Sequence, residues 1–235
     1  MTSRLGHRQY WLDRAAAGEE LAAQLSACLS LQGLRDKSAI VVALPRGGVA
    51  VAAVIAQKLG LPLTTWAVRK LTLPSNPEFA IGAIAGGDVV LWDPEIFDHL
   101  EKYPELRGQI LESERRELLR RKRLFGDAAP DALSKRDIIV VDDGIATGLT
   151  VKAALLSLRQ LSPSKLILAV PVVAAAALPG IRQLVDDAFV LSSVDNLIAV
   201  GCYYGSFEQL SDEDVLALLS GVNKPWRLGG KGCEC

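Results

Sequence analysis

Four runs of almost purely apolar residues constrain the fold of this chain more than any other feature. They span residues 38–44, 137–143, 165–173 and 188–191. Short apolar runs without polar alternation are typical of strands that are buried on both faces of a sheet. Strands that alternate with helices along a chain imply right-handed crossovers between parallel neighbours. The sequence therefore predicts an α/β fold with a mainly parallel sheet flanked by helices.

The segments around these runs complete the prediction. Apolar residues at helical spacing indicate helices over 10–31 and 49–59, and a third helix that runs through Leu161. A further extended run is expected over 63–68, and a hairpin across Gly86-Gly87. Residues 94–125 are highly charged and read as a helical insert. Pro74 and Pro77 favour an exposed loop between the extended run and the hairpin.

The composition limits the class of protein. The chain has 235 residues, half of them hydrophobic, and we expect one domain over residues 1–235. Lys and Arg total 26 against 27 Asp and Glu, so the net charge of −1 does not indicate a polyanionic partner. Four cysteines are too few for a disulfide framework, and no apolar stretch is long enough for a signal peptide or a membrane span. The sequence predicts a cytoplasmic protein with no membrane partner.

The segment from Val140 to Thr150 carries the clearest chemical signal. An apolar strand ends in two adjacent carboxylates, Asp142 and Asp143, and a loop of small and hydroxyl residues then leads into a helix. Amides at a helix N-terminus are unpaired and lie at the positive end of the helix dipole, so they bind a phosphate without needing a lysine. The carboxylates repel that phosphate but accept hydrogen bonds from vicinal sugar hydroxyls. The pattern predicts a ligand with a diol at one end and a phosphate at the other.

Each part of this segment also has an ordinary structural explanation. Asp143-Gly144 is a common turn pair, and residues 147–150 fit a helix start with a hydroxyl cap. The ordered whole favours a binding site, because two carboxylates at the end of an apolar strand cost stability unless something binds them.

This segment closely resembles the phosphoribosyl-pyrophosphate (PRPP) motif of the type I phosphoribosyltransferases, in which two acids and a few small residues precede Thr-Gly-x-Thr. The resemblance implies a type I phosphoribosyltransferase fold with a Rossmann-like core and a small C-terminal hood at about 186–221. It also implies that Asp142 and Asp143 hold the ribose 2- and 3-hydroxyls. The 5-phosphate would bind at the helix start, formed by Ala146, Thr147, Gly148, Leu149 and Thr150.

A second match lies about a hundred residues upstream. Leu44-Pro45-Arg46-Gly47-Gly48 is similar to the family's pyrophosphate loop, which implies pyrophosphate binding by Pro45, Arg46, Gly47 and Gly48. Arg69 and Lys70 fall where the family places basic residues at the root of a mobile loop, so they join the two aspartates as catalytic candidates. Residues 71–78 would be the lid, unless they are a plain proline-rich connection. The lid candidates are Leu71, Pro74, Asn76 and Glu78.

Further matches cover most of the chain and point to a less-characterised bacterial branch of the family. They include Asp13-Arg14, Asn76-Pro77-Glu78-Phe79-Ala80 and residues 199–207. The resemblance implies transfer of ribose 5-phosphate from PRPP to a nitrogenous base or related acceptor, with release of pyrophosphate. Mg²⁺ would be the cofactor, held through PRPP and water rather than by the protein. The partners implied are PRPP, a small-molecule acceptor and a second copy in a homodimer.

Other functions remain open at this stage. A non-catalytic protein that senses PRPP or a nucleotide would keep the same donor site. The basic run from Arg115 to Arg123 could contact nucleic acid, but the interleaved glutamates favour an ion-paired surface. Cys233 and Cys235 could bind a metal, but no third or fourth ligand lies nearby in the sequence, which favours a tail.

Overall fold

The computed structural model describes residues 10–31, 39–74 and 76–222. The Cys233 and Cys235 tail therefore lies outside the described residues. Along the chain, the elements are α1 (Arg14–Leu31), β1 (Ala39–Ala43), α2 (Gly47–Leu59), β2 (Leu63–Thr65), β3 (Val68–Leu73), β4 (Asn76–Ala85), the 3₁₀ turn η1 (Gly86–Asp88), β5 (Val89–Trp92), α3 (Pro94–Leu100), α4 (Pro104–Phe125), α5 (Pro130–Leu133), β6 (Asp137–Val141), α6 (Leu149–Arg159), β7 (Lys165–Ala174), α7 (Leu178–Arg182), β8 (Asp187–Val194), the 3₁₀ turn η2 (Val200–Tyr203) and α8 (Asp212–Val222).

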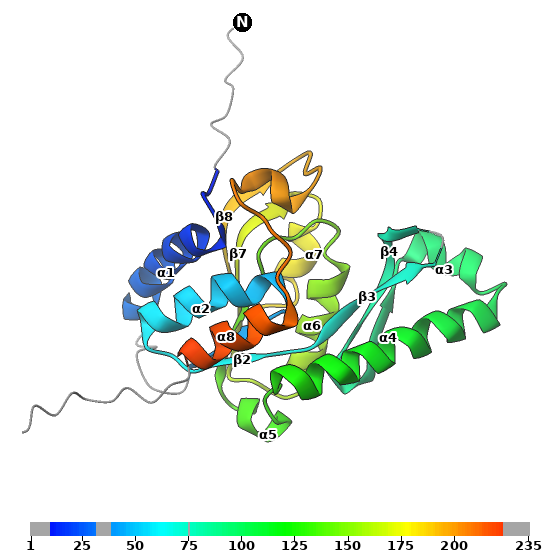
Figure 1. Ribbon diagram of the computed structural model, residues 1–235, viewed down its shortest axis with the longest axis horizontal. Coiled ribbons are helices and arrows are strands. Elements are labelled where there is room, and N and C mark those ends of the chain that lie inside the picture. The colour runs from blue at the N-terminus through cyan, green and yellow to red at the C-terminus, as the bar shows by residue number, and fades with distance from the viewer. Residues whose placement is uncertain (1–9, 32–38, 75, 223–235) are drawn as a thin grey trace, which may run out of the picture.

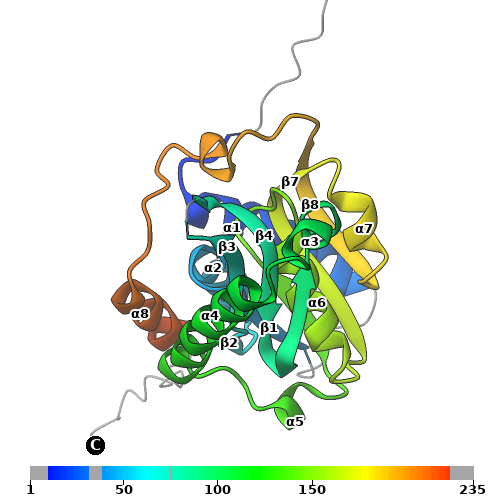
Figure 2. The ribbon, with the colours of Figure 1, turned by 90° about the vertical axis from the view of Figure 1, so that its right-hand side faces the viewer.

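A five-stranded sheet forms the centre of the molecule, with strand order β2-β1-β6-β7-β8. Every neighbouring pair in it is parallel, and the four apolar runs supply β1, β6, β7 and β8. Figures 1 and 2 show helices on both sides of this sheet. The predicted α/β fold, with a mainly parallel sheet flanked by helices, is confirmed.

The strands of the sheet alternate their side chains between two apolar layers. On β6, Ile139 and Val141 face the layer that contains α2 and α8, whereas Ile138 and Val140 face the layer that contains α6. All four side chains are fully buried. Burial on both faces explains why these strands appear in the sequence as continuous apolar runs.

A second, antiparallel sheet of order β3-β4-β5 extends from the body together with α3 and α4, at the right of Figure 1. The predicted hairpin across Gly86-Gly87 is its β4-β5 pair, and α3 with α4 is the predicted insert. We refer to residues 68–125 as the arm. Its own apolar core consists of Leu71, Ile81, Ile84, Leu100, Ile110 and Leu118, together with Ala67 at its base.

Two local predictions are wrong in this region. The extended run predicted over 63–68 stops at Thr65, because the Asp127 carboxylate binds both the Thr65 hydroxyl and the Ala67 amide, each at 2.7 Å, and the chain then enters the other sheet. The loop predicted over 71–78 is largely a β-hairpin. Its register shifts after Leu71, so the ladder passes from Asn76 to Ala80 and does not need the amide that Pro77 lacks.

The C-terminal region predicted as a hood, about 186–221, has three structural parts. β8 is an edge strand of the central sheet, and α8 packs in the apolar layer beside α2. Only the segment between them, residues 195–211, crosses the top of the molecule in Figure 1. A parallel bridge between Trp11 and Tyr204 joins this segment to the residues that precede α1. We keep the name hood for residues 195–211.

Within the described residues, no helix combines the length and the apolar character that crossing a bilayer requires.

Candidate functional site

The candidate site lies where β1 and β6 end side by side at the carboxyl edge of the sheet. From β1 the chain crosses through α2 to β2, and from β6 it crosses through α6 to β7 on the other side. The strand order therefore reverses between β1 and β6. In open α/β sheets, ligands bind in the crevice outside such a switch point.

The loops that follow these two strands are in close contact. The Leu44 amide donates to the Val141 carbonyl at 2.9 Å. A Cβ atom at Gly47 would overlap the Asp143 carboxylate, and one at Gly48 would lie 2.7 Å from the Val141 carbonyl oxygen. The two glycines are therefore required for the pyrophosphate-loop candidate, residues 45–48, to lie against the two aspartates.

The phosphate-cradle candidate, residues 146–150, forms the start of α6. Gly148 has a φ of +80°, a left-handed conformation that favours glycine, and directly precedes the helix. Ala146 and Thr147 are exposed and Thr150 is half-buried, so their polar groups are accessible to a ligand. The Leu149 side chain is buried in the core, so only its backbone can contribute.

Gly144 differs from Gly148 in what it allows. Among the described residues, the left-handed glycines are Gly60, Gly87, Gly126 and Gly148. A Cβ atom at Gly144 would instead collide with the side chains of Val172 and Val200. Gly144 therefore allows the loop to pack against β7 and the hood.

The two aspartates have different surroundings. One Asp142 carboxylate oxygen accepts the Asp143 amide at 2.9 Å, whereas Asp143 Oδ2 accepts Arg14 Nε at 2.8 Å. Burial raises the pKa of Asp142 well above its ordinary value of 3.8, and the charge of Asp143 adds to that rise. Burial also raises the pKa of Asp143, although the Arg14 guanidinium opposes the rise. The Tyr204 hydroxyl donates to the Asp143 main-chain carbonyl at 2.5 Å.

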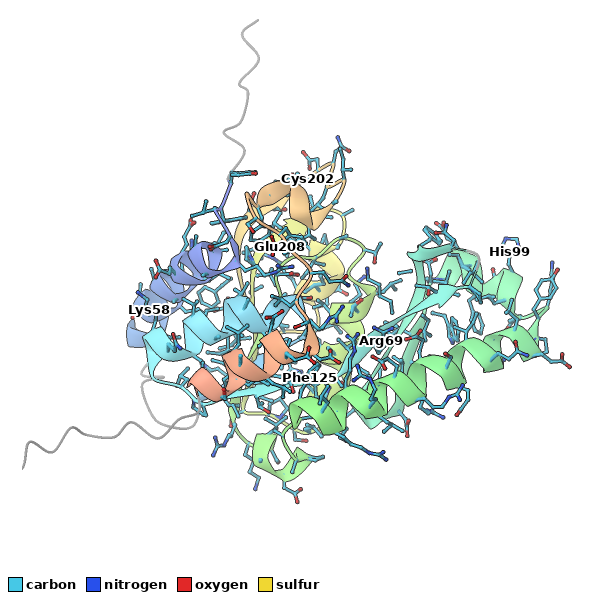
Figure 3. The ribbon with its side chains drawn as sticks, viewed as in Figure 1. Lys58, Arg69, His99, Phe125, Cys202 and Glu208 are labelled. Atoms are coloured by element: carbon cyan, nitrogen blue, oxygen red, sulfur yellow. The ribbon has the colours of Figure 1, made fainter. Side chains whose placement is uncertain are left out.

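The basic residues predicted around the site are only partly brought together. Lys70 is exposed, and its charge lowers the pKa of Asp142, so it acts on the aspartate pair through space. Arg69 is the preceding residue on β3 and points to the opposite face, where its guanidinium binds Glu114 of α4 at 2.8 Å. Figure 3 shows Arg69 between the body and α4. Arg46 lies 3.7 Å from Asp212 at the start of α8.

The lid candidates divide between core and surface. Leu71 is fully buried in the arm and cannot belong to a mobile segment unless that core opens. Pro74 and Asn76 are exposed at the hairpin tip, and Glu78 lies on β4. A lid could therefore comprise only the tip, beyond the register shift that follows Leu71.

Arg14 and Asp212 are charged residues near the site that sequence reasoning did not select. Arg14 is the first residue of α1, where a positive charge opposes the helix dipole. That unfavourable position was the available signal that the side chain has a tertiary partner. Asp212 showed no such signal, because an acid in the first turn of a helix is ordinary.

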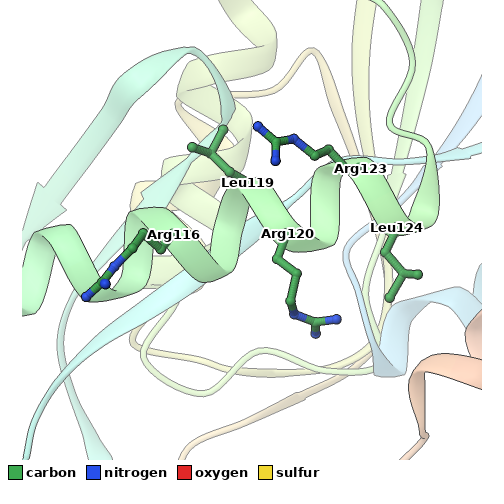
Figure 4. A pocket seen from close by; sticks show the side chains of 5 residues that line it. All are labelled: Arg116, Leu119, Arg120, Arg123 and Leu124. Atoms are coloured by element: carbon green, nitrogen blue, oxygen red, sulfur yellow. The ribbon is translucent and has the colours of Figure 1, made fainter.

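The basic run on α4 is largely ion-paired, as predicted. Arg115 binds Asp88, Arg116 binds Glu112, Arg120 binds Glu117 and Asp212, and Arg121 binds Glu117. A shallow cavity of about 560 Å³ lies along this helix, with the lining shown in Figure 4. Its lining residues are Arg116, Leu119, Arg120, Arg123 and Leu124. None of these belongs to the candidate PRPP site.

Within the part of the chain that the structure describes, no three His, Cys, Asp or Glu side chains form a group that could hold a metal ion. Cys202 is exposed with a free thiol, and Figure 3 places it in the hood and His99 on the arm.

Comparison with known proteins agrees with this fold. The family model for the phosphoribosyl transferase domain matches residues 11–204. Two relatives, from two strains of Mycobacterium tuberculosis, have names that place them among the phosphoribosyl transferases and are 36% identical to this chain over 224 residues. The alignment covers 93% of this chain and 48% of each relative, so the chain spans about half the length of these curated relatives.

A solved structure is also similar over most of its length. The crystal structure of TT1426 from Thermus thermophilus has 34% sequence identity and a TM-score of 0.67, and the match covers 89% of this chain and 97% of that one. The parallel sheet with its switch point defines a doubly wound α/β protein. The chain belongs to the phosphoribosyl transferase domain family.

Proposed function

We propose that this protein transfers ribose 5-phosphate from PRPP to a nitrogen acceptor and releases pyrophosphate. One observation carries the proposal: the loops after β1 and β6 lie in contact at the switch point of the sheet. This arrangement brings the pyrophosphate-loop candidate, the aspartate pair and the phosphate cradle to one edge of the sheet. These are the groups that a ligand with a diol, a phosphate and a pyrophosphate would require.

In this proposal, Asp142 and Asp143 bind the ribose hydroxyls, and the amides at the start of α6 bind the 5-phosphate. Arg46 and the glycine amides of residues 45–48 bind the pyrophosphate. In the reaction, the bond from C1 of the ribose to pyrophosphate breaks and a bond from C1 to the acceptor nitrogen forms. Fixed donors around the departing charge lower the barrier without a covalent intermediate.

The charge of Lys70 on β3 acts on Asp142, and in this proposal it adds a positive charge near the donor. Arg69 is proposed as a catalytic residue on sequence grounds, but its guanidinium is held by Glu114. It could reach a ligand only if that ion pair opened. Lys70 is therefore the stronger candidate of the two.

The proposed cofactor is Mg²⁺, which supplies charge neutralisation for the leaving pyrophosphate. Phosphate oxygens and water are ligands that Mg²⁺ prefers. The site fits this arrangement, because its pyrophosphate-binding candidates are a guanidinium and backbone amides, which leave coordination to the oxygens of PRPP and to water.

The test is an assay for pyrophosphate with PRPP, Mg²⁺ and a panel of purine, pyrimidine and amine acceptors. We expect pyrophosphate release that depends on one acceptor, and the same reaction without acceptor serves as the control. PRPP binding by calorimetry without any turnover would instead support a PRPP-sensing protein. No binding of PRPP with or without Mg²⁺ would overturn both the transferase and the sensor.

A further inference from the structure

Arg14 is held in place by three contacts, one on the loop after β6 and two on the hood. Its Nε donates to Asp143 Oδ2 at 2.8 Å, and Nη1 donates to the Glu208 carbonyl at 2.9 Å. Its guanidinium carbon lies 3.8 Å from the centroid of the Phe207 ring. The Arg14 and Asp143 side chains are only 11% and 15% exposed, so their ion pair is shielded from solvent. Loss of one partner of such a shielded pair leaves the other charge poorly solvated.

Among the described residues, the neighbouring Asp142 has no comparable partner. Its oxygen accepts the Asp143 amide, and Lys70, an exposed side chain, is the cation that acts on its charge. Two adjacent half-buried carboxylates do not ionise equally, because each opposes the charge of the other. A guanidinium fixed on one member of the pair therefore determines which member is ionised.

We infer that Arg14 is a positioning residue of the ribose site, which fixes the Asp143 carboxylate in one orientation and places the negative charge of the aspartate pair on Asp143. This inference rests on the proposed function, because it assigns the aspartates to the ribose. It goes further by giving the two aspartates different roles. Ionised Asp143 only accepts hydrogen bonds, whereas a protonated Asp142 can also donate one.

The other groups around the pair agree with this assignment. The Tyr204 hydroxyl binds the Asp143 main-chain carbonyl and leaves the carboxylate to Arg14. Gly47 places no side chain between the pyrophosphate loop and Asp143. Burial and the charge of Asp143 raise the pKa of Asp142 well above its ordinary value, whereas for Asp143 burial raises the pKa and the Arg14 guanidinium opposes that rise. The charged and titratable groups that act on the pair are therefore Arg14, Lys70 and Tyr204.

A purely structural role for Arg14 is the alternative, since the same side chain joins α1 to the hood. Comparison of three variants, Arg14→Gln, Arg14→Lys and Phe207→Leu, distinguishes an effect on Asp143 from a purely structural link between α1 and the hood. Phe207→Leu removes the aromatic ring beneath the guanidinium but leaves the ion pair with Asp143. It therefore serves as the matched control for the link to the hood.

The first measurement is the titration of the Asp143 carboxyl carbon by NMR in protein without ligand, with Asp143→Asn used to assign the signal. In Arg14→Gln we expect the midpoint to rise by about 1–3 pH units. Arg14→Lys should show a smaller rise, and Phe207→Leu should keep the wild-type midpoint while lowering the melting temperature. An unchanged midpoint in Arg14→Gln would overturn the inference. If Arg14→Gln does not fold, a wild-type midpoint in Arg14→Lys together with an unaltered affinity for PRPP would also overturn it.

The second measurement is PRPP affinity as a function of pH in the same variants. PRPP itself titrates in the same way with every variant. The pH dependence of affinity in each variant is therefore compared with that of the wild type. In Arg14→Gln, we expect the loss of PRPP affinity at low pH to begin at a higher pH than in the wild type, in step with the Asp143 midpoint. If the affinity falls at the same pH in both proteins, the inference is contradicted. Failure of the wild type to bind PRPP would overturn the proposed function, while the ligand-free titration would still test the effect of Arg14 on Asp143.

Discussion

At the scale of single residues, the candidate phosphate site consists of backbone amides rather than charged side chains. The start of α6 offers amides from residues 146–150, with a left-handed glycine at the turn and a buried leucine after it. A phosphate bound there would be held mainly by groups that side-chain substitution does not remove. This distinction can be tested by comparing substitutions at neighbouring positions.

We expect Gly148→Val to abolish PRPP binding and Thr147→Ala to weaken it only moderately. Valine is poorly compatible with a φ of +80°, so the loop must change conformation or bear a strain of about 1–3 kcal/mol. Thr147→Ala removes one hydroxyl donor and leaves the amides in place. Calorimetric titration of folded variants with PRPP and with ribose 5-phosphate measures both effects. Equal affinity of Gly148→Val and the wild type would show that this loop is not the cradle.

The raised pKa of Asp142 should affect how the free energy of unfolding depends on pH. In the pH range above 3.8, the unfolded carboxyl ionises while the folded one stays protonated, so the free energy of unfolding falls as pH rises toward the folded pKa. Asp142→Asn removes this component because the amide does not titrate. We expect the variant to match the wild type in stability at low pH and to exceed it at neutral pH.

Urea denaturation between pH 4 and pH 8 measures this difference. The control is Asp131→Asn at an exposed position of α5, which removes a carboxyl outside the candidate site. A parallel pH dependence in Asp142→Asn and the wild type would show that Asp142 is already ionised in the folded state.

At the scale of elements, the β3-β4 hairpin is the segment most suited to close over a ligand. Its root is fixed by the buried Leu71, whereas Leu73 pairs with Asn76 at an exposed tip. The pairing is irregular after Leu71, and Leu73 still packs against the arm core, so a moving tip would begin beyond Leu73.

If the tip closes over PRPP, protease cleavage near residues 73–76 should be slower with saturating PRPP and Mg²⁺ than without them. Mass spectrometry of the fragments locates the cut, and pyrophosphate alone serves as the control ligand. The same cleavage rate in both states would show that the hairpin does not act as a lid. Leu71→Ala should instead destabilise the arm by about 2–5 kcal/mol, because it leaves a cavity in its core.

At the scale of the whole molecule, charged side chains join the arm to the body. Arg120 of α4 binds Glu117 on its own helix and Asp212 of α8, and Asp212 lies near Arg46 of the pyrophosphate loop. Hydrogen bonds from Arg120 and Arg121 lower the pKa of Glu117 to about 2. The position of Arg46 is thus linked to the docking of α4.

Glu117→Gln should reduce the free energy of unfolding by about 1 kcal/mol at neutral pH, because the shielded Arg121 loses its partner. The Glu117 carboxylate contributes this stability above its unfolded pKa of 4.5 and loses it as pH falls toward 2. The difference between variant and wild type should therefore disappear in acid. Glu112→Gln is the control, since its pair with Arg116 is exposed and spans 3.9 Å. A difference that persists at pH 2 would contradict the ion-pair explanation.

The sequence alone determined the central sheet and the two loops of the candidate site. The apolar runs that became β1, β6 and β7 are buried in the sheet, and burial on both faces leaves a continuous signal in the chain. The run that became β8 lies at the edge of the sheet and is half-buried. The loops after β1 and β6 were recognisable because each is a short contiguous motif between a strand and a helix. A motif whose residues are contiguous in the chain can be identified without knowing which other segments contact it.

Only the tertiary structure decided how these parts meet. Arg14 and Asp143 are 129 residues apart in the chain, and their pairing depends on α1 packing beside the hood. Lys70 and Arg69 are adjacent in sequence but lie on opposite faces of β3. The charge of Lys70 acts on Asp142, whereas Arg69 binds Glu114 of α4. The pairing of β3 with β4 was missed because prolines and a register shift obscure its alternation. Contacts between distant segments leave no periodic signal in the sequence, since their energy comes from burial and charge pairing that exist only in the folded chain.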